Sequence, residues 1–199
     1  MPRDRSEGWN DIADQYLAAR SSIGADLVRA WARENLPPSA SVLDVGCGSG
    51  VPIAQVLIED GFNVFGIDAS PNLVAAFHAR FPDTPVACEA AQESVFFRRS
   101  FGGAVSIGLI FLLGEDDQRE VLRRIGDALE PGGRLLFSAP REICQWDDLL
   151  TCRPSRSLGE DAYVAHLQML GLRVVGCLND EGGNNYFDVV KNAVRVGPP

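Results

Sequence analysis

The sequence predicts an α/β fold in which a mostly parallel sheet of about seven strands is covered by helices on both faces and ends in an antiparallel hairpin. Short apolar runs alternate with segments of helical periodicity between residues 41 and 138, as expected for parallel strands joined by helices. A glycine-rich turn at residues 46–50 joins the first run to its helix. Further on, two apolar runs flank a polar turn at residues 179–185, which predicts the hairpin.

Two helices are expected before the first strand. Trp9 and Tyr16 belong to one set of apolar residues at helical spacing, and Ile23 and Trp31 belong to a second set. Prolines at 37–38 end the second helix. Because no strand accompanies them, residues 1–38 are predicted to form a helical cap over the edge or mouth of the sheet.

The core is predicted over residues 41–138, and residues 139–199 are expected to form the substrate-side segment and the C-terminal hairpin of the same domain. A chain of 199 residues is long enough for one domain with a sizeable core. Residues 139–157 are expected to be irregular, and the turn at residues 130–133 is expected to precede a strand. The expected elements are strand 41–45, helix 51–60, strand 64–68, helix 71–81, strand 85–88, strand 104–109, helix 115–129, strand 134–138, helix 158–170, and strands 172–178 and 186–191.

The most informative segment, from Val42 to Gly50, reads VLDVGCGSG. Its glycines follow the pattern G-x-G-x-G, whereas a dinucleotide-binding turn has G-x-G-x-x-G, and Val51 stands where that third glycine would be. Asp44, at the end of the strand, would repel a pyrophosphate but suits a ligand that carries an ammonium group. The alternative is a plain glycine turn between a strand and a helix, which does not explain Asp44.

The next predicted strand also ends in an acid, Asp68. It follows Gly50 by about the ~20 residues at which such folds place a carboxylate that binds ribose hydroxyls. Ser70 and Pro71 then suit the start of a helix. A polar residue at a strand end is unremarkable alone, but together with the glycine turn Asp68 indicates a site for a nucleoside-containing ligand.

These two motifs resemble those of the class I S-adenosylmethionine (SAM) methyltransferases, and the resemblance runs from Val42 to about Lys191. It implies a doubly wound, Rossmann-like sheet with a C-terminal hairpin, SAM as the cofactor, and methyl transfer as the reaction. The first helix is expected to approach the methionine end of SAM. The cofactor-binding residues that the resemblance implies are Tyr16, Arg20, Asp44, Gly46, Cys47, Gly48, Gly50, Asp68, Ala69, Leu73, Gln92, Glu93, Ile107 and Gly108.

The sequence departs from the family pattern after the fourth strand. Residues 106–111 read SIGLIF and lack the Asp/Asn-Pro-Pro-aromatic motif of enzymes that methylate exocyclic amines of bases. An aspartate often found before this strand and a histidine often found after it are also missing. Both histidines, His78 and His166, fall inside predicted helices. No catalytic base is therefore assigned, and no metal-binding pattern is found.

The acceptor is expected to be a small molecule that lies between the first helix and residues 139–157. The substrate candidates are Trp146, Asp147, Glu181 and Tyr186, although a capping cluster and an ordinary turn would explain them as well. A net charge of −9 argues against nucleic acid as a partner. No apolar run reaches the ~20 residues that span a bilayer. Two other functions stay open: a SAM-binding protein without catalysis and, less favoured, an NAD-dependent oxidoreductase.

The cysteines bear on the compartment. Their number, five, is odd and no C-x-x-C pair occurs, so neither a disulfide framework nor a zinc site is indicated. A reducing, cytoplasmic setting fits this pattern best.

Overall fold

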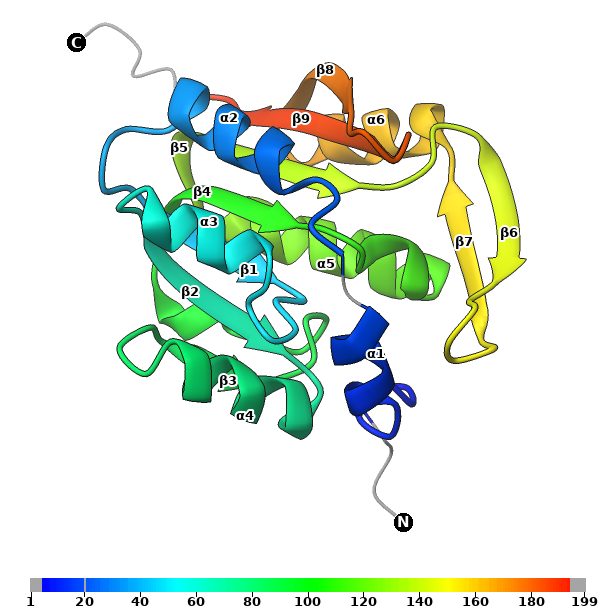
Figure 1. Cartoon of the computed structure of the whole chain (residues 1–199). Coiled ribbons are helices and arrows are strands. Elements are labelled where there is room, and N and C mark those ends of the chain that lie inside the picture. Colours follow the sequence, from blue (N-terminus) through cyan, green and yellow to red (C-terminus); the bar gives the residue numbers. More distant parts are fainter. Residues whose placement is uncertain (1–4, 20, 194–199) are drawn as a thin grey trace, which may run out of the picture.

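A seven-stranded sheet forms the centre of the molecule. The computed structural model describes residues 5–19 and 21–193. The strands of the sheet follow the order β3-β2-β1-β4-β5-β9-β8 (Figure 1). Strands β1 to β5 are mutually parallel, whereas β9 is antiparallel to β5 and β8. The predicted doubly wound, mostly parallel sheet with a C-terminal antiparallel hairpin is confirmed.

Most element boundaries lie close to those predicted. The strands of this sheet are β1 (Ser41–Val45), β2 (Asn63–Asp68), β3 (Val86–Cys88), β4 (Phe101–Ser106), β5 (Leu129–Ser138), β8 (Leu172–Asn179) and β9 (Asn185–Lys191). The helices are α1 (Ala13–Ala19), α2 (Ala25–Asn35), α3 (Ile53–Glu59), α4 (Pro71–Arg80), α5 (Glu115–Ala128) and α6 (Glu160–Met169), with short 3-10 turns η1 (Phe96–Arg98) and η2 (Ile110–Leu112). Within the described residues, no helix is long and apolar enough to cross a bilayer.

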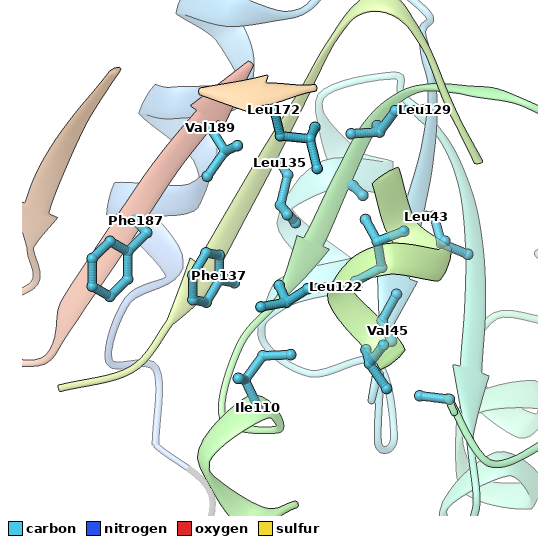
Figure 2. Packing of buried hydrophobic residues seen from close by; sticks show 14 of the residues in the cluster. Leu43, Val45, Ile110, Leu122, Leu129, Leu135, Phe137, Leu172, Phe187 and Val189 are labelled. Carbon is cyan, nitrogen blue, oxygen red and sulfur yellow. The ribbon is translucent and has the colours of Figure 1, made fainter. Parts of the chain in front are cut away.

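Two hydrophobic cores lie on opposite faces of the sheet. Helices α2, α3 and α4 pack on one face, and α5 and α6 pack on the other (Figure 1). In β1 the two-residue period directs Val42 to the first core and Leu43 and Val45 to the second. Figure 2 shows the second core, where the rings of Phe137 and Phe187 stack with their centroids 4.9 Å apart. Burial on both faces holds the strand ends, and the loops that follow them, in fixed positions.

Strands β4 and β5 differ from the prediction. Strand β4 covers Phe101–Ser106 rather than residues 104–109, and β5 begins at Leu129 and so includes the predicted turn at 130–133. Phe101 pairs with Leu129 and Gly103 with Arg134, so the register shifts between these pairs and accommodates the extra residues. A Cβ at Gly103 would lie 2.7 Å from Leu36 at the end of α2. Glycine is therefore needed in β4 although it lowers strand propensity, and this misled the sequence-based boundary.

A second sheet has two antiparallel strands, β6 (Ile143–Asp147) and β7 (Pro154–Leu158). It projects beyond the carboxyl ends of the parallel strands (Figure 1). We call residues 143–158 the arm. The prediction of irregular structure for residues 139–157 is wrong. The arm strands pair only with each other, exposed and half-buried residues alternate in β6, and the two buried positions of β7 are serines, so the strands lack the apolar runs that identify a buried strand.

Buried hydrogen bonds attach the base of the arm to the core. The Gln118 side chain in α5 donates from Nε2 to the Arg156 carbonyl oxygen in β7 at 3.1 Å and accepts from Tyr163 Oη in α6 at 2.7 Å. Helix α6 begins at Glu160 rather than at 158, because Leu158 still pairs in β7 and Gly159 has a φ of +84°. The base of the arm is thus fixed to two helices of the core.

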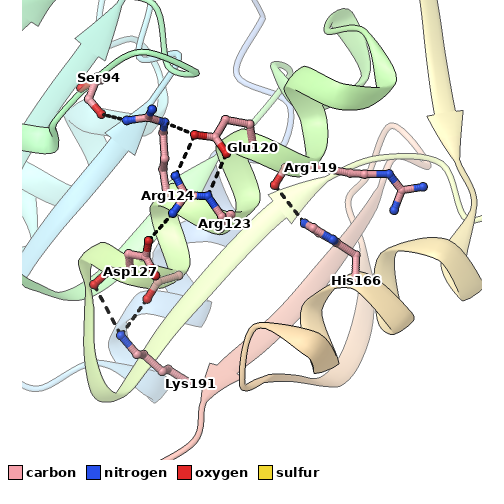
Figure 3. A network of polar contacts seen from close by, with 9 residues as sticks. Ser94, Arg119, Glu120, Arg123, Arg124, Asp127, His166 and Lys191 are labelled. Atoms are coloured by element: carbon pink, nitrogen blue, oxygen red, sulfur yellow. Dashed lines mark hydrogen bonds and ion pairs between the residues drawn. The ribbon is translucent and has the colours of Figure 1, made fainter.

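The exposed face of α5 carries a network of ion pairs (Figure 3). Glu120 accepts hydrogen bonds from Arg123 and Arg124 at 2.7 and 2.6 Å. The hydrogen bonds from Arg123 outweigh burial and, with Arg124, lower the pKa of Glu120 to about 2. Lys191 Nζ donates to the Leu129 carbonyl oxygen at 2.6 Å and so ties β9 to the end of α5. A ring nitrogen of His166 lies 2.9 Å from the Arg119 carbonyl oxygen, which gives this histidine a structural contact.

The turn of the C-terminal hairpin is organised by one buried carboxylate. Asp180 accepts hydrogen bonds from the backbone N–H groups of Gly182 and Asn184, both at 2.9 Å, and from Tyr186 Oη at 2.8 Å. Burial alone would raise the pKa of Asp180, but the donors around it outweigh burial and lower that pKa. The adjacent Glu181 accepts from the Gly24 backbone N–H at 3.2 Å. The hairpin turn therefore also fixes the start of α2.

Candidate functional site

The loops that follow the parallel strands enclose a cavity of about 250 Å³, here called the first cavity. Ligands of such sheets bind beyond the carboxyl ends of the strands, and the cavity lies at that edge. Its wall includes nine of the residues that sequence reasoning assigned to the cofactor. These are Tyr16, Gly46, Gly48, Asp68, Ala69, Leu73, Gln92, Ile107 and Gly108.

The glycine turn after β1 has two functions in this structure. The N–H groups of Gly46 and Cys47 both donate to the Ile67 carbonyl oxygen, at 2.9 and 3.0 Å, which holds the turn against β2. Gly46 and Gly48 have positive φ values and line the first cavity. Gly50, with a φ of +80°, lies elsewhere, and a Cβ there would collide with the Phe77 ring at 2.8 Å. Gly50 thus permits close packing of α4 rather than the approach of a ligand.

Two other residues of the motif are also absent from the cavity wall. Cys47 is buried below the turn, where its Sγ would lie 2.8 Å from a Cβ at Gly66. Burial is the main cause that raises the pKa of the Cys47 thiol well above its usual value, so this thiol stays protonated. Asp44 is 2% exposed and lies inside β1. Both residues are therefore buried beside the turn rather than exposed to a ligand in the first cavity.

Asp68, at the end of β2, is the central polar group of the first cavity. Its Oδ2 accepts a hydrogen bond from the Gly48 N–H at 2.9 Å, and its Oδ1 accepts one from the Ser70 N–H at 2.8 Å. Burial raises the pKa of Asp68, and these two hydrogen bonds only partly offset that effect. Each carboxylate oxygen can accept a further hydrogen bond, so the group can bind two hydroxyls.

Residues 5–19, here called the N-terminal segment, cover the first cavity. Asn10 Oδ1 accepts hydrogen bonds from Ser70 Oγ at 3.1 Å and from the Asn72 N–H at 3.0 Å, which fixes the segment on the start of α4. The rings of Trp9 and Tyr16 meet edge to face with centroids 5.5 Å apart, and both line the cavity. Helix α1 begins at Ala13, so Trp9 lies in the turns that precede it. Sequence reasoning missed Asn10, because its partners are about 60 residues away.

One predicted residue of this region, Glu93, does not line the cavity. Glu93 forms an ion pair with Arg5 at 2.9 Å, both side chains being more than half exposed, whereas the neighbouring Gln92 lines the cavity. Arg20 lies outside the described residues.

The arm contributes Asp148 to the wall of the first cavity, and a Cβ at Gly8 would lie 3.3 Å from Arg153 of the arm. The arm and the N-terminal segment therefore meet above the first cavity.

A second cavity of about 510 Å³ adjoins the first. Ile107, Gly108 and Phe111, which follow β4, line both cavities and form the shared wall. The Gly108 N–H donates to Ser138 Oγ at 2.8 Å, and its φ of +81° would direct a Cβ into space with no atom within 4 Å. The other lining residues are Ser21, Ile23, Ser138, Ala139, Pro140, Arg141, Glu142, Trp146, Asn179, Gly183, Asn184, Asn185 and Tyr186.

The four substrate candidates fall into different places. Trp146 lines the second cavity and packs on Phe111, with ring centroids 5.4 Å apart and planes inclined by 44°. Tyr186 also lines it, but its side chain is 1% exposed and its hydroxyl donates to Asp180. Asp147 is exposed and lines neither cavity. Glu181 caps the start of α2 as described above and lines neither cavity.

Comparison with known proteins agrees with this geometry. The model of the family described as "Methyltransferase domain" matches residues 16–188. The 18S rRNA (guanine(1575)-N(7))-methyltransferase of Saccharomyces cerevisiae is 32% identical over 148 residues, which cover 68% of this chain and 52% of that protein. The O-methyltransferase resE of Aspergillus sclerotiorum is 31% identical over 149 residues, which cover 67% of this chain and 55% of that protein. The chain thus spans about half the length of these curated relatives.

Solved structures show the same fold. The 1,6-didemethyltoxoflavin-N1-methyltransferase of Burkholderia thailandensis, with bound 1,6-didemethyltoxoflavin and S-adenosylhomocysteine, aligns with a TM-score of 0.73 at 19% identity. The alignment covers 95% of this chain and 87% of that one. The chain therefore belongs to the methyltransferase domain family, and the class I SAM-dependent methyltransferase identity inferred from its glycine turn and Asp68 is confirmed, with SAM as the cofactor.

Proposed function

We propose that the protein transfers a methyl group from SAM in the first cavity to a small-molecule acceptor in the second. The observation that carries this proposal is the wall of Ile107, Gly108 and Phe111, which both cavities share. These three residues mark the place where the two cavities adjoin. A ligand in one cavity and a ligand in the other would therefore approach each other beside them. The open space in front of Gly108 leaves room for the transferred group.

The side chains and backbone of the first cavity suit SAM. In this proposal Asp68 accepts hydrogen bonds from the ribose hydroxyls through the lone pairs that the backbone leaves available. Leu73 covers the adenine, and Gln92 binds its amine. Gly46 and Gly48 let the backbone come close to the methionine end. Tyr16 and Ala69 complete the enclosure, while Asp44, Cys47 and Gly50 act by shaping the glycine turn.

The protein contributes alignment and exclusion of water. When bound, SAM supplies a methyl group that its sulfonium makes electrophilic. The shared wall holds the acceptor in line with that group, and the N-terminal segment and the arm keep water away. Ile107, Gly108 and Phe111 carry no ionisable side chain, so the wall itself does not take a proton from the acceptor. We therefore assign positioning roles here and no general base.

A small acceptor is supported by size and charge. The second cavity, of about 510 Å³, falls within the ~300–1,000 Å³ typical of small-molecule sites. The net charge of −9 disfavours a phosphate backbone. Two of the related proteins are named for small-molecule or O-methylation, and the yeast relative is named for rRNA. RNA is accordingly the alternative acceptor that the test has to address.

The division of the chain and its compartment complete the proposal. We assign residues 1–38 to a cap, residues 41–138 to cofactor binding, and residues 139–199 to the acceptor side and the C-terminal hairpin of one domain. The cysteines all lie within the described residues and are free thiols. This pattern supports a reducing, cytoplasmic setting.

Calorimetry with SAM, S-adenosylhomocysteine and NAD tests the proposal. Binding of the first two at micromolar or better dissociation constants is expected, with no heat from NAD, because the glycine turn lacks the third glycine of a dinucleotide-binding turn. Turnover of SAM with a panel of small acceptors should follow. Binding of NAD alone would overturn the cofactor assignment. Tight RNA binding that weakens steeply with salt would overturn the small-molecule assignment.

The affinity for SAM should fall in mild acid because of Asp68. Ribose hydroxyls donate to the ionised carboxylate, so SAM binds the deprotonated form, and protonation must raise the dissociation constant. Since burial raises the pKa of Asp68, this loss should begin at a higher pH than for an ordinary aspartate. Calorimetric titrations between pH 4 and 7 measure it. Asp68→Asn should remove this acid limb, and an identical limb in that variant would refute the assignment.

A further inference from the structure

We propose that the acceptor is a planar aromatic or heteroaromatic molecule and that Trp146 of the arm selects it by ring contact. The inference rests on the proposed function, since it concerns the second cavity as the acceptor site. It adds the chemical class of the acceptor and the residue that distinguishes it.

The arm presents one face to the cavities. Along β6, the exposed residues Ile143, Gln145 and Asp147 alternate with the half-buried residues Cys144 and Trp146. Strand geometry sends alternate side chains to opposite faces, so Trp146 lies on the inner face, and it lines the second cavity. The bonds of Gln118 hold the base of the arm to the core. Trp146 is therefore carried on an anchored strand, in a defined position.

The ring of Trp146 continues the shared wall. Its centroid lies 5.4 Å from that of Phe111, which itself lines both cavities. Both side chains are only half buried although they contact each other, so apolar ring surface remains open beside Ile107. An acceptor that lies against Ile107 and Gly108 in the second cavity lies beside these rings, which line the same cavity. A flat molecule can cover them fully, whereas a saturated ring of similar size cannot.

The polar groups around the second cavity offer little alternative recognition. Arg141 is paired with Glu160 at 2.6 Å, and Ser138 Oγ accepts the Gly108 N–H. The Asn184 and Tyr186 side chains both donate to Asp180. The Asn185 amide donates to the Ala139 carbonyl oxygen at 3.0 Å, and its Oδ1 is fully covered.

The other polar residues that line the second cavity are exposed; these are Ser21, Glu142 and Asn179. Arg141 and Glu142, the charged residues of the second cavity, are exposed to solvent, which weakens charge pairing with an acceptor, so contact with the aromatic rings is the main recognition that the described residues provide.

The test measures binding to protein saturated with S-adenosylhomocysteine. 1-Naphthol and its saturated counterpart, decahydro-1-naphthol, serve as a matched pair of probes, and ligand-observed NMR titration gives both dissociation constants. Wild type should prefer the planar member. Trp146→Leu should reduce that preference roughly three- to tenfold, the range expected for the loss of one aromatic contact, and Trp146→Phe should retain most of it.

Ile143→Ala provides the matched control, because Ile143 lies on the opposite face of the same strand and is 84% exposed. The affinity for S-adenosylhomocysteine, measured separately, should be unchanged in all three variants. Normal cofactor affinity with no planar preference in wild type, or with the same preference in Trp146→Leu, would overturn the inference and leave the proposed function intact. A wild-type protein that binds neither SAM nor S-adenosylhomocysteine would overturn the proposed function itself.

Discussion

Replacing Asp68 with alanine is expected to raise the dissociation constant for SAM by about 100-fold or more. The carboxylate is proposed to accept two hydrogen bonds from the ribose, and hydrogen bonds to a charged group contribute roughly 1.5–3 kcal/mol each. Its bonds to the N–H groups of Gly48 and Ser70 also hold the glycine turn in the geometry that lines the first cavity. Both losses act in the same direction. Isothermal calorimetry on the purified variant measures the change.

Controls separate loss of binding from loss of folding. Asp83, which is exposed in the loop after α4, provides a matched aspartate, and Asp83→Ala should bind SAM as wild type does. Circular dichroism should show that Asp68→Ala retains its helices and strands. A folded Asp68→Ala protein with an unchanged dissociation constant would exclude the ribose role of this carboxylate.

Replacing Asp180 with alanine should produce the largest loss of stability among the polar substitutions considered. The side chain organises the hairpin turn, and its removal takes away the acceptor for Tyr186 Oη, in a residue that is 1% exposed. It also takes away the acceptor for three donors of Gly182 and Asn184. We expect a cost of about 3 kcal/mol in the free energy of unfolding. For a chain of this size, that corresponds to a decrease in Tm of roughly 6–12 °C.

Thermal and urea unfolding test this expectation, with Asp83→Ala again as the control. Tyr186→Phe should cost only about 1 kcal/mol, because the carboxylate then keeps its other donors. Since the folded-state pKa of Asp180 is lowered, its contribution to stability is complete above the pKa of the unfolded chain and is lost as the pH falls through the folded-state value. A Tm for Asp180→Ala within about 1 °C of wild type would contradict the assigned role.

The local signals in the sequence predicted the parallel core well. The segment from Val42 to Ile53 contains a strand, a turn and the first residue of a helix in direct succession, so its order of elements can be read from neighbouring residues, although Ile67 and Phe77 also hold the turn in place. Asp68 could be placed for the same reason, because a parallel strand that follows a crossover helix must end at the same edge of the sheet. Both motifs consist of elements that follow one another directly in the chain, so a pattern of neighbouring residues is enough to predict them.

Other features depend on contacts between distant parts of the chain. The sequence could not decide between Gln92 and Glu93, because which of two adjacent polar residues faces the cavity depends on the turn that follows β3 and on Arg5. The arm was missed because its strands pair only with each other and have no apolar run, the buried positions of β7 being serines. The shared wall could be inferred only in part. Ile107 and Gly108 were expected to bind the cofactor, but Phe111 joins them only because β4 ends at Ser106 and η2 follows.

Residues that line both cavities and residues that line only one differ in what a substitution can change. A larger residue at Gly108 would alter both cavities at once, so mutation there tests the cofactor and the acceptor together. Trp146, by contrast, lines only the second cavity and projects from an arm anchored at its base. Under the proposed function, substitutions at Trp146 can therefore change the range of acceptors while the residues that line the first cavity stay as they are.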